Sequence, residues 1–101
     1  MNIEIKEQNG SYLGILTGWI DTAEASQFLE DLNPLSANAD KRIELACSKL
    51  EYICSLGLRG LLKLKKESAA KGGSLVLTHV GGEFQKILVM TGFIKLFNIR
   101  V

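Results

Sequence analysis

The sequence predicts an α/β domain in which helices pack on a mixed β-sheet, with elements in the order ββαβαβα and a closing β-segment. Two observations support this prediction. Segments with strand-like patterns recur along the chain, and after the first two they alternate with segments whose apolar residues have helical spacing. With 101 residues, 47% of them hydrophobic, the chain has the length and composition of one domain, residues 1–101, with a single core.

The first two strands are expected to form an antiparallel hairpin. Ile3 and Ile5 alternate with polar residues, and the segment SYLGILTG has the pattern of a second strand. Asn9-Gly10 lies between them, and this dipeptide accepts positive φ at both central positions of a tight turn.

The first helix is expected within WIDTAEASQFLEDLNP. Asp21 and Glu24 frame its start as a capping box does, and Pro34 marks its end. The i, i+3, i+4, i+7 spacing of one helical face is met by four apolar residues: Ala25, Phe28, Leu29 and Leu32.

The middle of the chain predicts a strand and a longer helix. RIELAC alternates in the manner of a strand, and KLEYI carries the chain from it towards the second helix. That helix is expected from about Leu56 to Lys71. It ends at Gly72-Gly73, where a residue without Cβ can adopt the left-handed conformation.

The last third repeats this alternation. SLVLTHV has the pattern of a strand buried on both faces, and Phe84, Ile87 and Leu88 predict a third helix that stops at Gly92. KLFNIRV is expected to form a final short strand or terminal segment. The loops that follow the second, third and fourth strands precede helices, and helix amino termini at the carboxyl ends of strands form the usual functional edge of such a sheet.

Composition excludes several classes of function. Lys and Arg number 12 against 11 acidic residues, so no net field attracts nucleic acid or a membrane surface. The two cysteines, Cys47 and Cys54, lack CxxC spacing and have no companion ligands, so we expect no metal site. The glycine pairs lack the spacing and the lysine of a phosphate-binding loop, and we expect no cofactor on this chain. Without a signal peptide or a transmembrane run, the protein is expected to be cytoplasmic.

A serine beside a cysteine raises the question of catalysis. Ser55 lacks the G-x-S-x-G elbow because Ile53 stands two positions before it, and the single histidine, His79, has no evident acid partner. Cys54 lies near a helix amino terminus that can lower a thiol pKa, but a free cysteine is more often a small buried hydrophobe. We therefore expect no catalytic residue.

Three segments carry a family resemblance: GWIDTAEA, LEYICSLGLRGLLKLKKESAAKGGSLVLTHV and MTGFIKLFNI. In order and spacing they resemble the STAS domain of bacterial anti-sigma factor antagonists, over nearly the whole chain. The resemblance implies the SpoIIaa-like fold and a protein that regulates transcription by partner switching rather than by catalysis. In this family the unmodified antagonist binds an anti-sigma factor that is a serine kinase. Phosphorylation of one serine ends the binding, and a phosphatase restores it.

Aligned on Gly57, the phosphorylated serine of the family falls on Ser55, and Asp21 matches the aspartate of the family's G-x-I/L-D turn. We expect the protein to be a monomer or weak dimer. Its expected partner-binding residues lie around the edge that holds Ser55: Asp21, Cys54, Leu56, Gly57, Leu58 and Arg59.

Two alternatives to this assignment stay open. Ser55 could serve only as the helix N-cap, a role worth about 1 kcal/mol, and Asp21 has an equally good structural role as a cap paired with Glu24. The chain also departs from the family: Cys54 replaces the frequent Asp before the serine, and Ala46 replaces the Asp of the L-D-L strand motif. These departures favour a degenerate STAS domain that is not phosphorylated and acts as a scaffold or small-ligand sensor.

Overall fold

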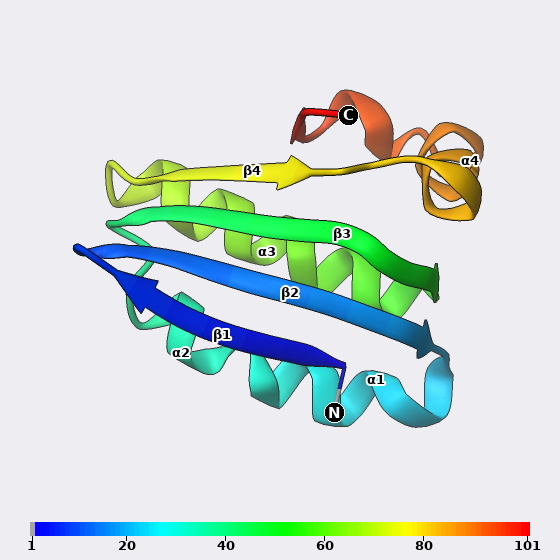
Figure 1. The fold of residues 1–101 in the computed structure, drawn as a ribbon, viewed down its shortest axis with the longest axis horizontal. Helices are drawn as coiled ribbons and strands as arrows, with labels where there is room; N and C mark the ends of the chain where they lie inside the picture. Colours follow the sequence, from blue (N-terminus) through cyan, green and yellow to red (C-terminus); the bar gives the residue numbers. More distant parts are fainter. Residues whose placement is uncertain (1) are drawn as a thin grey trace.

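The computed structural model describes residues 2–101, which form a five-stranded mixed sheet with helices on one face and at one end (Figure 1). The strands are β1 (Ile3–Gln8), β2 (Ser11–Ile20), β3 (Arg42–Ile53), β4 (Ser74–Thr78) and β5 (Asn98–Ile99). The helices are α1 (Thr22–Asp31), α2 (Asn33–Ser36), α3 (Ser55–Ala70) and α4 (Gly82–Thr91), with a 3-10 turn η1 (Phe93–Lys95). The predicted α/β class and order are confirmed, and α2 and η1 are additions.

The strands lie in chain order, β1-β2-β3-β4-β5, which is the simplest arrangement this element order allows. β1 is antiparallel to β2, and all the later neighbours are parallel. The predicted hairpin is confirmed, because Gln8 pairs with Ser11 across a two-residue turn in which Asn9 has φ 53° and Gly10 has φ 80°.

The first helix ends earlier than predicted, and Pro34 has a different role. α1 stops at Asp31, with Leu32 as its C-cap, and Pro34 lies in the first turn of the short helix α2. Proline suits this position because its fixed φ is helical and its missing N–H would have no intrahelical acceptor there. Pro34 therefore begins an element rather than only ending one.

The third strand is longer than predicted, because KLEYI continues β3 instead of forming a connection. β3 pairs with β2 up to the contact of Ile53 with Ile20, with register shifts opposite Ile15–Thr17 and Gly18–Trp19. Each shift places an extra residue in β3, which interrupts the alternation that the sequence pattern relies on. The result is a strand that projects beyond β4, whose last pair is Thr78 with Ala46.

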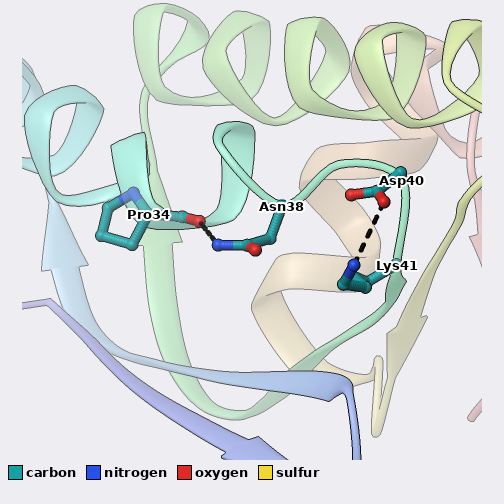
Figure 2. Close-up of polar contacts among 4 residues, drawn as sticks. All are labelled: Pro34, Asn38, Asp40 and Lys41. Carbon is teal, nitrogen blue, oxygen red and sulfur yellow. Dashed lines mark hydrogen bonds and ion pairs between the residues drawn. The ribbon is translucent and has the colours of Figure 1, made fainter.

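The predicted end of α3 is confirmed. Gly72 has φ 78°, and the Gly73 N–H donates to the Ser68 carbonyl at 2.9 Å, as in a Schellman motif. Gly73 is also packed against the loop between α2 and β3: a Cβ there would lie 2.6 Å from the Lys41 carbonyl oxygen. That loop is held by the Asn38 side chain, which donates to the Pro34 carbonyl at 2.8 Å (Figure 2).

The fourth strand is shorter than predicted, and the face opposite Leu75 and Leu77 is only partly buried, because Thr78 is buried but Ser74 is exposed. β4 ends at Thr78, and His79, with φ 56°, turns the chain away from the sheet. Leu75 and Leu77 are buried, whereas Val76 on the opposite face is half-exposed. After the turn, α4 packs beside the part of β3 that projects past β4, and Gly92 ends it with φ 79° (Figure 1).

The core lies between one face of the sheet and the helices α1, α2 and α3 (Figure 1). Fully buried residues from the sheet, such as Leu16 and Leu45, meet Phe28 of α1 and Leu61 of α3. Each of these side chains contributes about 1.5–3 kcal/mol through burial. No helix among residues 2–101 is long and apolar enough to cross a membrane.

Candidate functional site

The ends of β2 and β3 place Asp21 and Cys54 side by side. Ile20 and Ile53 are paired, and the Cys54 N–H donates to the Ile20 carbonyl oxygen at 2.9 Å. Both strands then lead into helices. Asp21 follows β2 and precedes α1, and Ser55 follows Cys54 and opens α3. Residues more than 30 positions apart in the sequence therefore meet at the carboxyl edge of the sheet, as predicted.

Asp21 is the N-cap of α1. It has extended backbone angles (φ −88°, ψ −174°), and its Oδ1 accepts a hydrogen bond from the Glu24 N–H at 3.0 Å. This bond satisfies one amide that the helix cannot pair internally, a contribution of about 1 kcal/mol. The predicted role of Asp21 as the helix cap is confirmed, although the reciprocal capping-box bond from the Asp21 N–H to the Glu24 carboxylate is not found within residues 2–101. The half-buried Asp21 carboxylate stays at the surface of the edge.

Ser55 is not the N-cap of α3, which corrects one of the two alternatives for this residue. The cap position belongs to Cys54, whose backbone is extended (φ −76°, ψ 168°) and whose side chain makes no capping hydrogen bond. Ser55 is the first helical residue and is exposed. Its hydroxyl therefore points to solvent from the opening turn, and a cap is not the reason for a serine here.

Ser55 begins an exposed face of α3. Leu56 is 39% exposed, and Arg59 lies one helical turn after Ser55 and is exposed as well. Beside this face a groove runs between α3 and the α1–α2 segment. The groove is lined by apolar and charged residues from these helices: Leu29, Leu32, Asn33, Ser36, Leu56, Arg59, Gly60, Lys63 and Glu67.

Three of the predicted contact residues are turned inward. Cys54 is 8% exposed and Leu58 is 1% exposed, so their side chains belong to the core and the expectation of direct partner contact does not fit them. Gly57 is buried too, and a Cβ there would lie 2.7 Å from Cγ1 of Ile53. The sequence SLGL does not by itself show which of its residues are buried, because neighbouring residues of a helix face different directions.

Close packing of α1 on α3 sets the width of the groove. At Gly60 a Cβ would meet the flexible end of the Leu29 side chain, so glycine lets the two helices approach closely here without displacing that side chain. Near the far end of the groove, the Ser36 hydroxyl donates to Oε1 of Glu67 at 2.9 Å and links α2 to α3.

Sequence reasoning missed an aromatic pair at the same edge. Trp19 is 59% exposed and stacks on Tyr52, with ring centroids 4.6 Å apart and planes inclined by 24°. The two residues are paired neighbours on β2 and β3. The alternation of SYLGILTGWI puts Trp19 and Ile20 on opposite faces of the strand. The stacking partner of Trp19, Tyr52, could be identified only once the full length of β3 was known.

Among residues 2–101, no side-chain hydrogen bond joins Ser55 to either cysteine or to the histidine. Burial raises the pKa of the Cys47 thiol from 9.0 to about 12, which keeps it protonated and inert at neutral pH. Within residues 2–101, no hydrogen bond joins His79 to Ser55 or Cys54. In the same described part of the chain, no group of three or more His, Cys, Asp or Glu residues is arranged to hold a metal ion.

Comparisons with known proteins agree with this geometry. A family model described as "Mlab, STAS domain" matches residues 15–98. A protein of Bordetella bronchiseptica, BtrV, which is named as a presumed anti-sigma factor antagonist, is 26% identical over 99 residues, covering 98% of this chain and 85% of its own.

Two solved structures share the fold. A Thermotoga maritima protein, also described as a presumed anti-sigma factor antagonist, superposes with a TM-score of 0.83 at 18% identity, covering 98% of this chain and 86% of its own. SpoIIAA of Bacillus, a cell fate determinant solved in its phosphorylated form, gives a TM-score of 0.71 at 15% identity, covering 98% of this chain and 91% of its own.

Proposed function

The chain belongs to the STAS domain family, and on this premise we propose that it is an anti-sigma factor antagonist that is switched by phosphorylation of Ser55. In this proposal, the unmodified protein binds a serine-kinase anti-sigma factor through the edge formed by Asp21, Ser55, Leu56 and Arg59. A phosphate on Ser55 ends the binding, and a phosphatase restores it. The observation that carries the proposal is the exposed hydroxyl of Ser55 at the first turn of α3, free of a capping role.

The position of Ser55 suits a residue that must be both modified and tolerated. An exposed residue at a strand-to-helix junction is open to a kinase, and the positive end of the helix dipole favours the added charge. The first turn of α3 contains no acidic residue, and Arg59 lies four positions on. The phosphate therefore meets no carboxylate within the first turn of α3.

The same phosphate would oppose a partner. Leu56 is next to Ser55 and offers apolar surface that a partner would cover. Covering it would also desolvate a neighbouring dianion, which costs several kcal/mol when no cation in the partner compensates. Because about 1.4 kcal/mol changes affinity tenfold, one phosphate is sufficient for a switch.

The buried residues of the predicted set support the edge from behind. Leu58 anchors the first turn of α3 in the core, and Gly57 lets that turn approach Ile53. We propose that Cys54, Gly57 and Leu58 position the contact surface rather than form it. Trp19 and Tyr52 extend the surface on the β2–β3 side.

Affinity capture tests the proposal. Wild-type protein, Ser55→Ala and Ser55→Asp are used as bait in native lysate, and the captured proteins are identified by mass spectrometry. Wild type and Ser55→Ala should retain an anti-sigma factor with a kinase domain, and Ser55→Asp should lose it at least tenfold. Ser74→Asp is the matched control. Ser74 is also exposed, but it opens β4 at the amino ends of the parallel strands, away from the carboxyl ends where Ser55 lies. Equal retention by Ser55→Asp and wild type would contradict the switch.

A second candidate is the unphosphorylated scaffold or ligand sensor. It is favoured by the residue before Ser55, which is a buried cysteine instead of the acid frequent in the family. Intact mass of the protein recovered from its native cell distinguishes the two. A phosphate on Ser55 supports the switch, and its absence under every growth condition supports the scaffold.

A further inference from the structure

β1 forms a free margin of the sheet, far along the sheet from β5, whose two residues form the other margin (Figure 1). In the hairpin, Gln8 pairs with Ser11 across the tight turn, and at the far end the Thr17 N–H donates to the Asn2 carbonyl oxygen at 2.9 Å. The even-numbered residues of β1 thus direct their backbone groups to β2. Because the pattern alternates in an antiparallel pair, the N–H and C=O groups of Ile3, Ile5 and Glu7 point away from the sheet.

An apolar groove accompanies this edge. It lies between β1 and the junction of α1 with α2, which run along the same margin (Figure 1). Ile3, Ile5 and Pro34 supply its apolar part, and Ile5 is only half-buried. A strand added beside β1 would lie about 4.8 Å from it, with every second side chain directed towards this groove.

The groove has an acidic rim. Two acidic residues of its lining, Glu30 and Asp31, come from the end of α1, and none of the lining residues is cationic. Glu4 also lines the groove, although strand alternation directs its side chain to the face opposite Ile3 and Ile5. Glu4 and Glu30 are exposed, and among residues 2–101 Asp31 accepts a side-chain hydrogen bond only from the neutral Gln27 amide, at 2.9 Å. The ion pairs found within residues 2–101 lie elsewhere, at Asp40–Lys41 and Glu83–Lys86. A complementary occupant therefore carries positive charge.

A second copy of β1 does not meet this requirement. Its sequence, IEIKEQ, would bring Glu4 and Glu7 of a second chain to an edge that is already acidic, with a single lysine to offset them. We propose that the β1 edge is a strand-addition site for an extended segment of a partner protein in which apolar residues alternate with lysine or arginine. The backbone of the segment pairs with Ile3, Ile5 and Glu7, its apolar side chains fill the groove, and its cations reach the carboxylates of the rim.

A synthetic peptide tests this site on the intact chain. The probe is a capped peptide of about seven residues in which Val and Lys alternate, and the comparison peptide has Glu in place of every Lys. Binding is followed by amide chemical shifts and by hydrogen exchange of the protein. The Val/Lys peptide should slow the exchange of the Ile3, Ile5 and Glu7 amides, and the Val/Glu peptide should bind at least tenfold more weakly.

Backbone methylation separates strand pairing from simple charge attraction. Two further Val/Lys peptides carry N-methyl groups, one on all the valines and the other on all the lysines. Because alternate residues of a strand direct their N–H groups to opposite sides, one methylated peptide should lose binding and the other should keep most of it.

Charge reversal tests the acidic rim. The double variant Glu30→Lys/Asp31→Lys should bind the Val/Lys peptide about tenfold more weakly, and cations in the last turn of α1 favour the helix dipole, so the fold is retained. The control double variant Glu51→Lys/Glu83→Lys makes the same change in net charge at exposed positions away from β1 and should bind as wild type. Circular dichroism checks that both variants are folded.

Each remaining outcome overturns the proposal. These outcomes are no binding of the Val/Lys peptide, equal binding of the Val/Glu peptide, equal effects of the two methylation patterns, or equal weakening by both double variants. Pairing of β1 with β1 of a second copy, seen as self-association that Glu7→Pro abolishes, would also contradict it. None of these results bears on Ser55, so this inference and the proposed switch fail independently.

Discussion

Ser68 and Cys47 show how single buried atoms affect this fold in different ways. Ser68 is 1% exposed, and its Oγ has no hydrogen-bond partner within the described part of the chain. Cys47 is 3% exposed and finds a weak acceptor, the Leu45 carbonyl oxygen, at 3.4 Å. A hydroxyl without a partner lowers stability at every pH, whereas a buried thiol does so only where it would ionise.

Ser68→Ala should stabilise the protein. The substitution removes a buried hydroxyl without a partner and places the best helix former in the last turns of α3, so we expect a gain of about 1 kcal/mol in the free energy of unfolding. Urea denaturation measures this gain. Ser26→Ala, at an exposed position of α1, is the control and should change stability by less than about 0.5 kcal/mol. A loss of stability on Ser68→Ala would show that the hydroxyl is hydrogen-bonded.

Because the Cys47 thiol is buried, we expect the protein to lose stability at alkaline pH. Burial raises the pKa of this thiol from 9.0 to about 12, so between these values the unfolded chain releases a proton that the folded chain keeps. The free energy of unfolding should therefore fall as pH rises above about 9, with a contribution from this thiol of up to about 1.4 kcal/mol per pH unit. Urea denaturation between about pH 8 and 10.5 measures the slope. Cys47→Ala should have a shallower slope, and an equal slope would refute the assignment.

At the scale of elements, glycines decide how closely the segments pack. Gly73 lies where the end of α3 meets the loop before β3, and its Cα faces the carbonyl oxygens of Ala39 and Lys41. Gly60 has a similar role between α3 and α1, but there the neighbour is the flexible end of Leu29. Backbone atoms cannot move aside as a side chain can. Adding a Cβ should therefore lower the free energy of unfolding more at Gly73 than at Gly60.

Gly73→Ala should destabilise the protein by about 2–3 kcal/mol, since its Cβ meets backbone oxygens on the α2–β3 loop. Gly72→Ala, where φ is 78° and space is open, should cost about 1 kcal/mol from backbone strain alone. Gly81→Ala has open space and extended φ, so it should be close to neutral. Thermal denaturation of the three variants gives the order. An equal cost at positions 72 and 73 would contradict the proposed contact with backbone.

At the scale of the whole molecule, the proposed switch and the scaffold are separate. The core is closed by α1 and α3 on one face of the sheet, and Ser55 lies outside it on the first turn of α3. Charge added at Ser55 therefore changes the surface that a partner meets without changing the packing beneath.

Ser55→Asp should leave stability within about 0.5 kcal/mol of wild type, because an exposed anion at a helix amino terminus is neutral or slightly favourable. Leu58→Ala, three positions on, removes a buried side chain and should cost about 2–5 kcal/mol. Guanidinium denaturation followed by Trp19 fluorescence measures both. Should Ser55→Asp unfold the domain, loss of partner binding by that variant would say nothing about a switch.

The sequence by itself determined the α/β class, the hairpin, the glycines that end α3 and α4, and the place of Ser55 after the third strand. These follow from local periodicity and from backbone angles that only a few residue types adopt, both of which act within a few positions of the chain. Only the tertiary structure decided the length of β3, the inward direction of Cys54 and Leu58, the stacking of Trp19 on Tyr52 and the free acidic edge of β1. Those features depend on strand register and on the packing of α1 against α3, which join residues far apart in the sequence and leave no local pattern in it.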